Sequence, residues 1–160
     1  MAMGAVQCTS CRSLPFMGLP DPSPITTAAQ AFAAVALAAV ACDGQLATVE
    51  ARSLRQQLEY RQPFCELGDH AMGALLDNLL QLLRLHGWEA LVSQAAPLLN
   101  RQQAETALAV AAALTQADHV ESSVEVTFLH TLSDALALEP ERARVIVEVV
   151  AILNRDSLAC

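Results

Sequence analysis

Two pairs of acidic residues repeat at one spacing in this chain. The first pair is Asp43 and Glu50, the second is Asp118 and Glu125, and each acid of the first pair recurs 75 residues later. Carboxylate oxygens are the ligands that hard divalent cations prefer. The two pairs therefore predict a divalent-cation site, for which Ca²⁺, Mg²⁺ and Mn²⁺ are favoured and Zn²⁺ is a further candidate.

The residues around the acids repeat as well. When residues 34–54 are placed on residues 109–129, several small and apolar side chains also match, among them Val35 with Val110 and Leu54 with Leu129. Repetition at one fixed offset is typical of two copies of one supersecondary unit. The sequence therefore predicts two halves related by a pseudo-two-fold axis, with their acidic loops close together.

A second interpretation of the acids needs no metal. Asp43 precedes Gly44 in a dipeptide that is common in turns. A Glu in the first turn of a helix is stabilised by the helix dipole, and the run from Ser122 to Glu125 has the pattern of a capping box. The loops lack the alternating acids of an EF-hand. Turn and cap chemistry therefore stays open beside metal binding.

The elements that must position these acids are all predicted to be helices. Apolar residues recur at helical spacing, and no segment alternates with a period of two. Gly87 is expected to separate two helices, Asn100 to cap one and Pro140 to open another. The predicted ranges are 26–41, 48–61, 66–86, 88–99, 101–117, 122–137 and 140–154. The expected fold is an all-α, compact seven-helix bundle.

Two of these helices, over residues 26–41 and 101–117, are rich in Ala. Because small side chains let helix axes approach closely, we expect these two to pack together at the centre of the domain. Residues 25–42 carry no charge, but Ala and Thr gain little from lipid. We therefore interpret this segment as a buried core helix and predict no membrane insertion.

The ends of the chain differ in character. Residues 1–24 hold four of the seven prolines and read as a flexible tail, whereas residues 25–157 form one predicted helical domain. Cys8 and Cys11 have zinc-ligand spacing, but no second pair completes the four ligands of a structural zinc site. We interpret them as an inert thiol pair in the tail.

Composition excludes several classes of partner. The net charge is −8, and all nine basic residues are Arg. An acidic chain is a poor ligand for a nucleic-acid backbone, and the lack of Lys rules out a Walker-type phosphate loop and Schiff-base chemistry. Five Cys, an odd number, with no signal peptide at the start of the sequence predict reduced thiols in the cytoplasm.

Catalytic motifs are missing from the sequence. It contains no Gly-x-Ser-x-Gly, no His-Glu-x-x-His and no Gly-rich phosphate loop, which predicts a protein that is not an enzyme. The alternative function is a metal-independent helical protein–protein interaction module. Phe64 and Trp88 flank the leucine-rich segment 66–86 and are interpreted as core residues, with partner anchoring as the alternative.

The repeated motif resembles the tellurite-resistance TerB family. The segments that carry the resemblance are Ala41–Gly44 through Glu50 and Gln116–Asp118 through Glu125, within about residues 26–154. Membership implies a compact seven-helix fold and metal binding by the four acids. It also implies a stress-response role as a sensor or scaffold, often with membrane-bound protein partners. His119 stands where the family motif has Gly, which puts the second turn in doubt.

Overall fold

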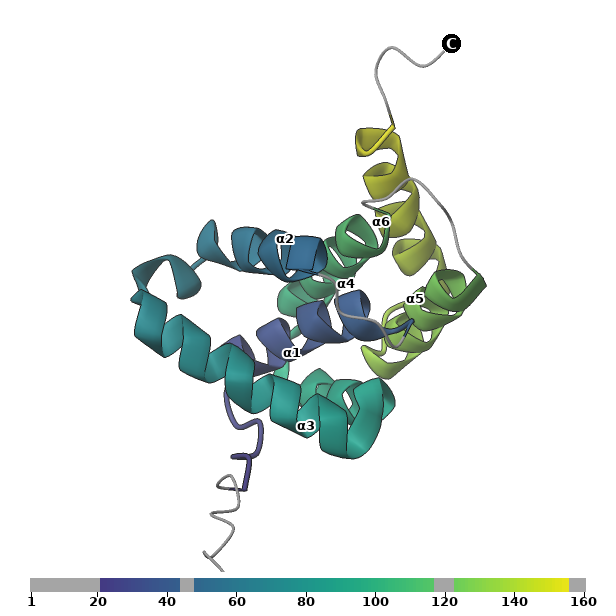
Figure 1. The fold of residues 1–160 in the computed structure, drawn as a ribbon. Helices are drawn as coiled ribbons and strands as arrows, with labels where there is room; N and C mark the ends of the chain where they lie inside the picture. The colour runs from purple at the N-terminus through teal and green to yellow at the C-terminus, as the bar shows by residue number, and fades with distance from the viewer. Residues whose placement is uncertain (1–20, 44–47, 117–122, 156–160) are drawn as a thin grey trace, which may run out of the picture.

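The protein is a helical bundle in the part of the chain that the structure describes (Figure 1). The structure, a computed structural model, describes residues 21–43, 48–116 and 123–155, with the side chains of residues 48–50 excepted. Every regular element within these ranges is a helix, and none of these residues lies in a strand. The prediction of an all-α fold is therefore confirmed.

Six α-helices and two short 3₁₀-helices make up the described bundle. They are α1 (Ala28–Ala41), α2 (Thr48–Glu59), η1 (Phe64–Glu66), α3 (Asp69–Ala95), η2 (Ala96–Leu98), α4 (Arg101–Thr115), α5 (Ser123–Ala135) and α6 (Pro140–Leu153). The expected count of seven is not found here, because residues 69–95 form one element. Gly87 lies inside α3 with φ of 82° and ψ of 168°, which is not helical, so two helical segments meet at a kink there and the predicted separation at Gly87 is confirmed.

The helix ends follow the local sequence. Asn100 caps α4: its side chain accepts a hydrogen bond from the Gln103 amide, and the Gln103 side chain accepts one from the Asn100 amide. This reciprocal pair is a capping box. Pro140 is the first residue of α6, where its missing N–H costs nothing. Both predictions from the sequence are confirmed.

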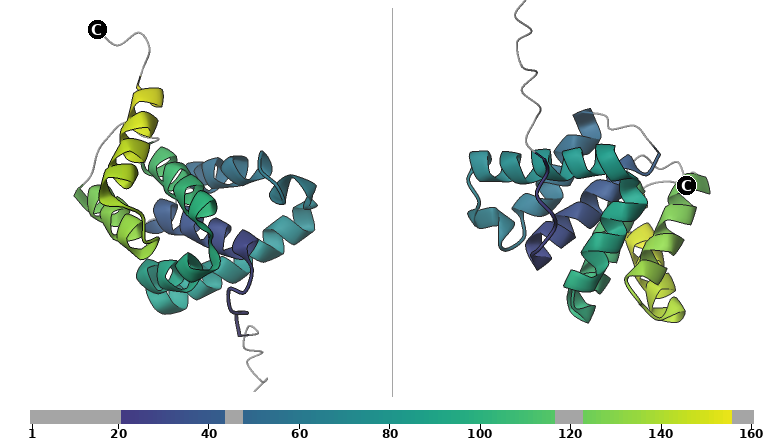
Figure 2. Two further views of the ribbon diagram at one scale, coloured as in Figure 1. Left: turned by 180° about the vertical axis from the view of Figure 1, so that it is seen from behind. Right: turned by 90° about the horizontal axis from the view of Figure 1, so that it is seen from below.

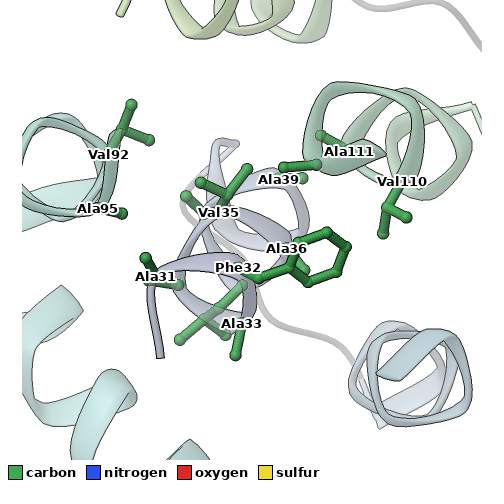
Figure 3. Close-up of a cluster of buried hydrophobic side chains, with 14 of the residues drawn as sticks. Ala31, Phe32, Ala33, Val35, Ala36, Ala39, Val92, Ala95, Val110 and Ala111 are labelled. Carbon is green, nitrogen blue, oxygen red and sulfur yellow. The ribbon is translucent and has the colours of Figure 1, made fainter. Parts of the chain in front are cut away.

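Helix α1 lies at the centre of the fold. Its residues 31–40 are all buried, on every side of the helix. Figure 3 shows α1 between side chains of α3, such as Val92 and Ala95, and side chains of α4, such as Val110 and Ala111. Small side chains on α1 and α4 bring the two helices into extensive contact. The expected packing of the two Ala-rich helices is therefore observed.

Aromatic side chains fill the core at two other places. The rings of Phe32 and Phe64 are 6.1 Å apart, and Trp88 meets Phe128 edge-to-face at 5.1 Å. Edge-to-face pairs are a favoured aromatic geometry. Phe64 and Phe128 are almost fully buried, and Trp88 packs against the core. The interpretation of Phe64 and Trp88 as core residues is confirmed.

The last helix is attached mainly to α4. Helix α6 packs against α4 much more extensively than against α5. Arg142 adds a forked ion pair across the same contact, because its Nη2 and Nε donate to the two carboxylate oxygens of Glu105 at 2.9 and 3.2 Å. Figure 2 shows α6 running along α4 and extending past it.

The chain enters the bundle along α3. The Ser23 amide donates to Asn78 Oδ1 at 2.7 Å, and Asn78 Nδ2 donates back to the Ser23 carbonyl at 2.9 Å. Residue 23 belongs to the predicted tail, so the end of that tail is attached to α3. The remainder of the tail, with Cys8 and Cys11, lies outside the described residues. None of the described helices is long and apolar enough to cross a membrane.

Candidate functional site

The first acidic segment begins where α1 ends. Cys42 is the C-terminal cap of α1, half-buried, and its thiol donates a hydrogen bond to the Ala39 carbonyl at 3.3 Å. Asp43 follows at the surface. The residue is exposed, so its carboxylate lies outside the hydrophobic core.

The second acidic segment reaches the same place from the other half of the chain. Glu125 lies in the first turn of α5. Burial, the charge of Glu125 and the charge of Asp43, in that order, raise the pKa of the Cys42 thiol to about 11. A carboxylate acts in this way only when it is near the thiol. Figures 1 and 2 show the C-terminal end of α1 beside α5. Asp43 and Glu125 are therefore both close enough to Cys42 for their charges to act on its thiol.

The four predicted ligands can be followed only in part. Asp43 and Glu125 are described and share the Cys42 region. Glu50 is in the first turn of α2, but its side chain lies outside the described residues, as do Asp118, His119 and Ser122. Among the residues that are described, no three His, Cys, Asp or Glu side chains come together as a metal site. The expected set of four carboxylates stays a prediction.

A groove of about 630 Å³ begins at Glu125 and runs between α5 and α6. Figure 1 shows these helices diverging from their short connection, with the end of α4 between them. The floor is apolar. It is formed by Val126 and Leu129 of α5 and by Ala143, Val147 and Ala151 of α6. We call this feature the α5–α6 groove.

Charged side chains line the rim of the α5–α6 groove. Three are carboxylates, Glu125, Asp134 and Glu148, and one is the guanidinium of Arg144. Arg144 donates to Glu148 at 3.1 Å, as well as to Glu141 outside the groove. His130 Nδ1 lies 3.2 Å from the Asp134 carboxylate, and the imidazole is largely exposed. The rim is therefore acidic overall.

Helix α6 leaves much apolar surface uncovered by the described residues. Only Ala143 of this helix is buried. Val145, Val149 and Ile152 are exposed on the side away from the groove, and Leu153 is 76% exposed. The same helix carries charged residues (Glu141, Arg142, Arg144 and Glu148), so these apolar side chains are exposed on a partly charged helix. Exposed apolar surface of this kind is typical of interaction sites.

A second hollow, of about 520 Å³, lies at the opposite end of α1. It is lined by residues of α1, of the segment around η1 and of the start of α4, including Phe32, Phe64 and Arg61. Arg61 Nη1 donates to the Gln57 carbonyl at 2.5 Å, so its guanidinium is held by the last turns of α2, the helix just before it. This hollow holds no carboxylate and no His among its lining residues.

Reasoning from the sequence found the acidic segments but missed the groove. The signal available for the groove was the run of apolar residues from Val145 to Leu153, which is longer than one face of a helix needs. The leucine-rich part of α3, for which a partner surface was the alternative interpretation, packs in the core through Met72, Leu79 and Leu82.

Comparisons with known proteins identify no family for this chain. A scan against protein-family models, a search of curated proteins and a search of solved structures each gave no match. The function is therefore argued from the site itself.

Proposed function

We propose that this chain is a non-enzymatic, TerB-like stress-response protein that binds a divalent cation through its acidic segments. In this role the domain is a sensor or scaffold for a protein partner. The observation that supports the proposal is that Glu125, from α5, lies close enough to the end of α1 for its charge to act on Cys42, as the charge of Asp43 does. The two halves of the sequence repeat contribute one acid each to this place.

The physical argument concerns charge. Two carboxylates held near one thiol raise the local negative potential, and a divalent cation relieves their repulsion. Oxygen donors favour Ca²⁺, Mg²⁺ and Mn²⁺ over softer ions. Glu50 and Asp118, one from each repeat, would complete a set of four oxygen-donor side chains. If the same acids act only in turns and helix caps, no cation should change the stability of the protein.

Thermal unfolding of metal-stripped protein tests the proposal. An ion at about one hundred times its dissociation constant adds roughly 2.7 kcal/mol of stability, or several degrees in Tm for a domain of this size. We expect this shift with Ca²⁺, Mg²⁺ or Mn²⁺ in the wild type and its loss in Asp43→Asn/Glu125→Gln.

The matched control is Asp77→Asn/Glu139→Gln. Asp77 is exposed on α3, and Glu139 precedes α6 without a side-chain capping bond. This variant removes the same charge at two residues that are not among the charges acting on Cys42, so it should keep the full shift. Equal shifts in both double variants, or none in the wild type, would assign the acids to turns and caps.

A second candidate function is a metal-independent helical interaction module. The observation that favours it is the α5–α6 groove, with its apolar floor and the exposed side chains of α6. Surfaces of this kind on soluble proteins commonly mark binding sites. Under this alternative, Asp43→Asn leaves stability and partner binding unchanged with and without added cations.

A further inference from the structure

We infer that the α5–α6 groove binds a basic amphipathic helix of a partner protein. The inference rests on the interaction role and does not depend on the cation site. It follows from three properties of the groove: an apolar floor, an acidic rim and a length that matches a short helix.

The floor supplies the apolar part of the contact. Val126 is 58% exposed, and Val147 and Ala151 are partly exposed beside it. They lie over the buried side chains of Leu129 and Ala143. An amphipathic helix places large aliphatic side chains at positions i, i+3, i+4 and i+7 along one face. A volume of about 630 Å³ accommodates several of them.

The acidic rim of the groove favours a positively charged partner. Three carboxylates face one guanidinium around the groove, and Arg144 is already paired with Glu148 and Glu141. The chain as a whole carries a net charge of −8. Arg or Lys side chains flanking an apolar stripe would meet Glu125 and Asp134 at the rim, whereas an acidic helix would be repelled.

The length of the groove indicates the size of the occupant. The residues of α6 that line it run from Pro140 to Ala151. This is about three helical turns, or roughly 16 Å at 1.5 Å per residue. A partner helix of about 11 to 14 residues would cover it. Such a helix would also extend the contact already made by α6, which packs on only one side.

The experiment measures binding of designed peptides by fluorescence anisotropy, with a chelator present so that no cation contributes. The first peptide is a 14-residue amphipathic helix with Leu on one face and Arg at the flanking positions. The second replaces each Arg by Glu, and the third scrambles the first so that the Leu face is lost. We expect saturable binding of the first peptide alone, weakening as salt is raised from about 50 to 300 mM.

Two valines on α5 provide a matched pair of variants. Val126 lines the groove, whereas Val124, on the same helix and also exposed, does not. We expect Val126→Asn to lower the affinity for the basic peptide about tenfold and Val124→Asn to leave this affinity unchanged. Asp134→Asn/Glu148→Gln should weaken the binding of the basic peptide and reduce the dependence of this binding on salt. Circular dichroism of each variant checks that the fold is kept.

Each other outcome would overturn the inference. Equal affinity for the acidic or scrambled peptide would reject the basic amphipathic helix while leaving an interaction site in place. Equal effects of Val124→Asn and Val126→Asn would place the peptide elsewhere. Failure of all three peptides would reject helix docking. None of these results bears on the thermal shift with cations, so the two proposals fail separately.

Discussion

Glu125, in the first turn of α5, lies close enough to Cys42, at the end of α1, for its charge to act on the thiol, although the two residues belong to opposite halves of the sequence. The carboxylate of Glu125 contributes to raising the pKa of the Cys42 thiol to about 11, after burial and before Asp43. The same Glu125 lines the end of the α5–α6 groove. One side chain therefore connects the acidic segments with the apolar surface beside them.

The thiol of Cys42 gives a direct test of this relationship. In a background where the other four cysteines are replaced by Ser, Cys42 should react with iodoacetamide very slowly at pH 8, because little thiolate is present below a pKa of about 11. Glu125→Gln removes a negative charge, so the pH profile of alkylation should move to lower pH.

Glu139→Gln is the control for that measurement, since Glu139 precedes α6 and does not act on Cys42. A profile that is the same for Glu125→Gln and the wild type would show that the two acidic segments are apart in solution. The free thiol of Cys65, which is exposed, should react faster than Cys42 when either is the only cysteine retained.

Two glycines of α3 should respond in opposite directions to the same substitution. Gly87 has a φ of 82°, and a Cβ there would lie 3.3 Å from the Glu89 carboxylate. Gly87→Ala should therefore destabilise the protein by about 1–2 kcal/mol. Gly73 is within the helix with open space around it, so Gly73→Ala should stabilise by about 0.4–1 kcal/mol. Urea unfolding measures the free energy of unfolding of both variants. A change of the same sign in the two variants would contradict the kink at Gly87.

The ion pair between α4 and α6 predicts a pH dependence. Hydrogen bonds from Arg142, together with Arg101, lower the pKa of Glu105 below its ordinary value of 4.5. A lowered pKa stabilises the fold above the unfolded-state value, and this stabilisation is lost as the pH falls through the folded-state value. Glu105→Gln should be less stable than the wild type at pH 6, and the difference should close between about pH 4.5 and pH 3.

The comparison for that pH series is Asp77→Asn, which neutralises an exposed carboxylate on α3. Its stability relative to the wild type should change little over the same range. A Glu105→Gln difference that stays constant from pH 6 to pH 3 would show that the loss comes from packing and not from the charge of Glu105.

The close approach of α1 and its neighbours predicts sensitivity to side-chain size. Ala36 is 1% exposed at the centre of the bundle, so Ala36→Leu should cost about 1–3 kcal/mol by overpacking. Ala71→Leu, on the exposed side of α3, should stay within about 0.5 kcal/mol of the wild type. Guanidinium unfolding distinguishes them, and a neutral Ala36→Leu would contradict the tight packing around α1.

Much of the fold was predictable because its signals are local. Asn100 and Pro140 mark helix starts by their own chemistry, and the Ala content of α1 and α4 indicated close packing. Gly87 interrupts the helical geometry where the sequence predicted, and the count differs because the segments on either side of it are counted together as α3.

Less of the candidate site than of the fold could be predicted from the sequence. The motif predicted that acids from both halves meet; the charges of Asp43 and Glu125 both act on Cys42, and the set of four carboxylates stays a prediction. The groove depends on the angle at which α5 and α6 diverge, which is fixed by the packing of α6 on α4 and by the Glu105–Arg142 pair. The spacing of apolar residues within α5 or α6 does not determine that angle.

The burial of α1 has a consequence for how the molecule is built. Residues 31–40 are covered on one side by α3 of the first half and on the other by α4 of the second. Neither half alone can shield so apolar a helix from water. The two halves of the chain are therefore inseparable as folding units: a chain divided before α4 should form a native structure only when both fragments are present together.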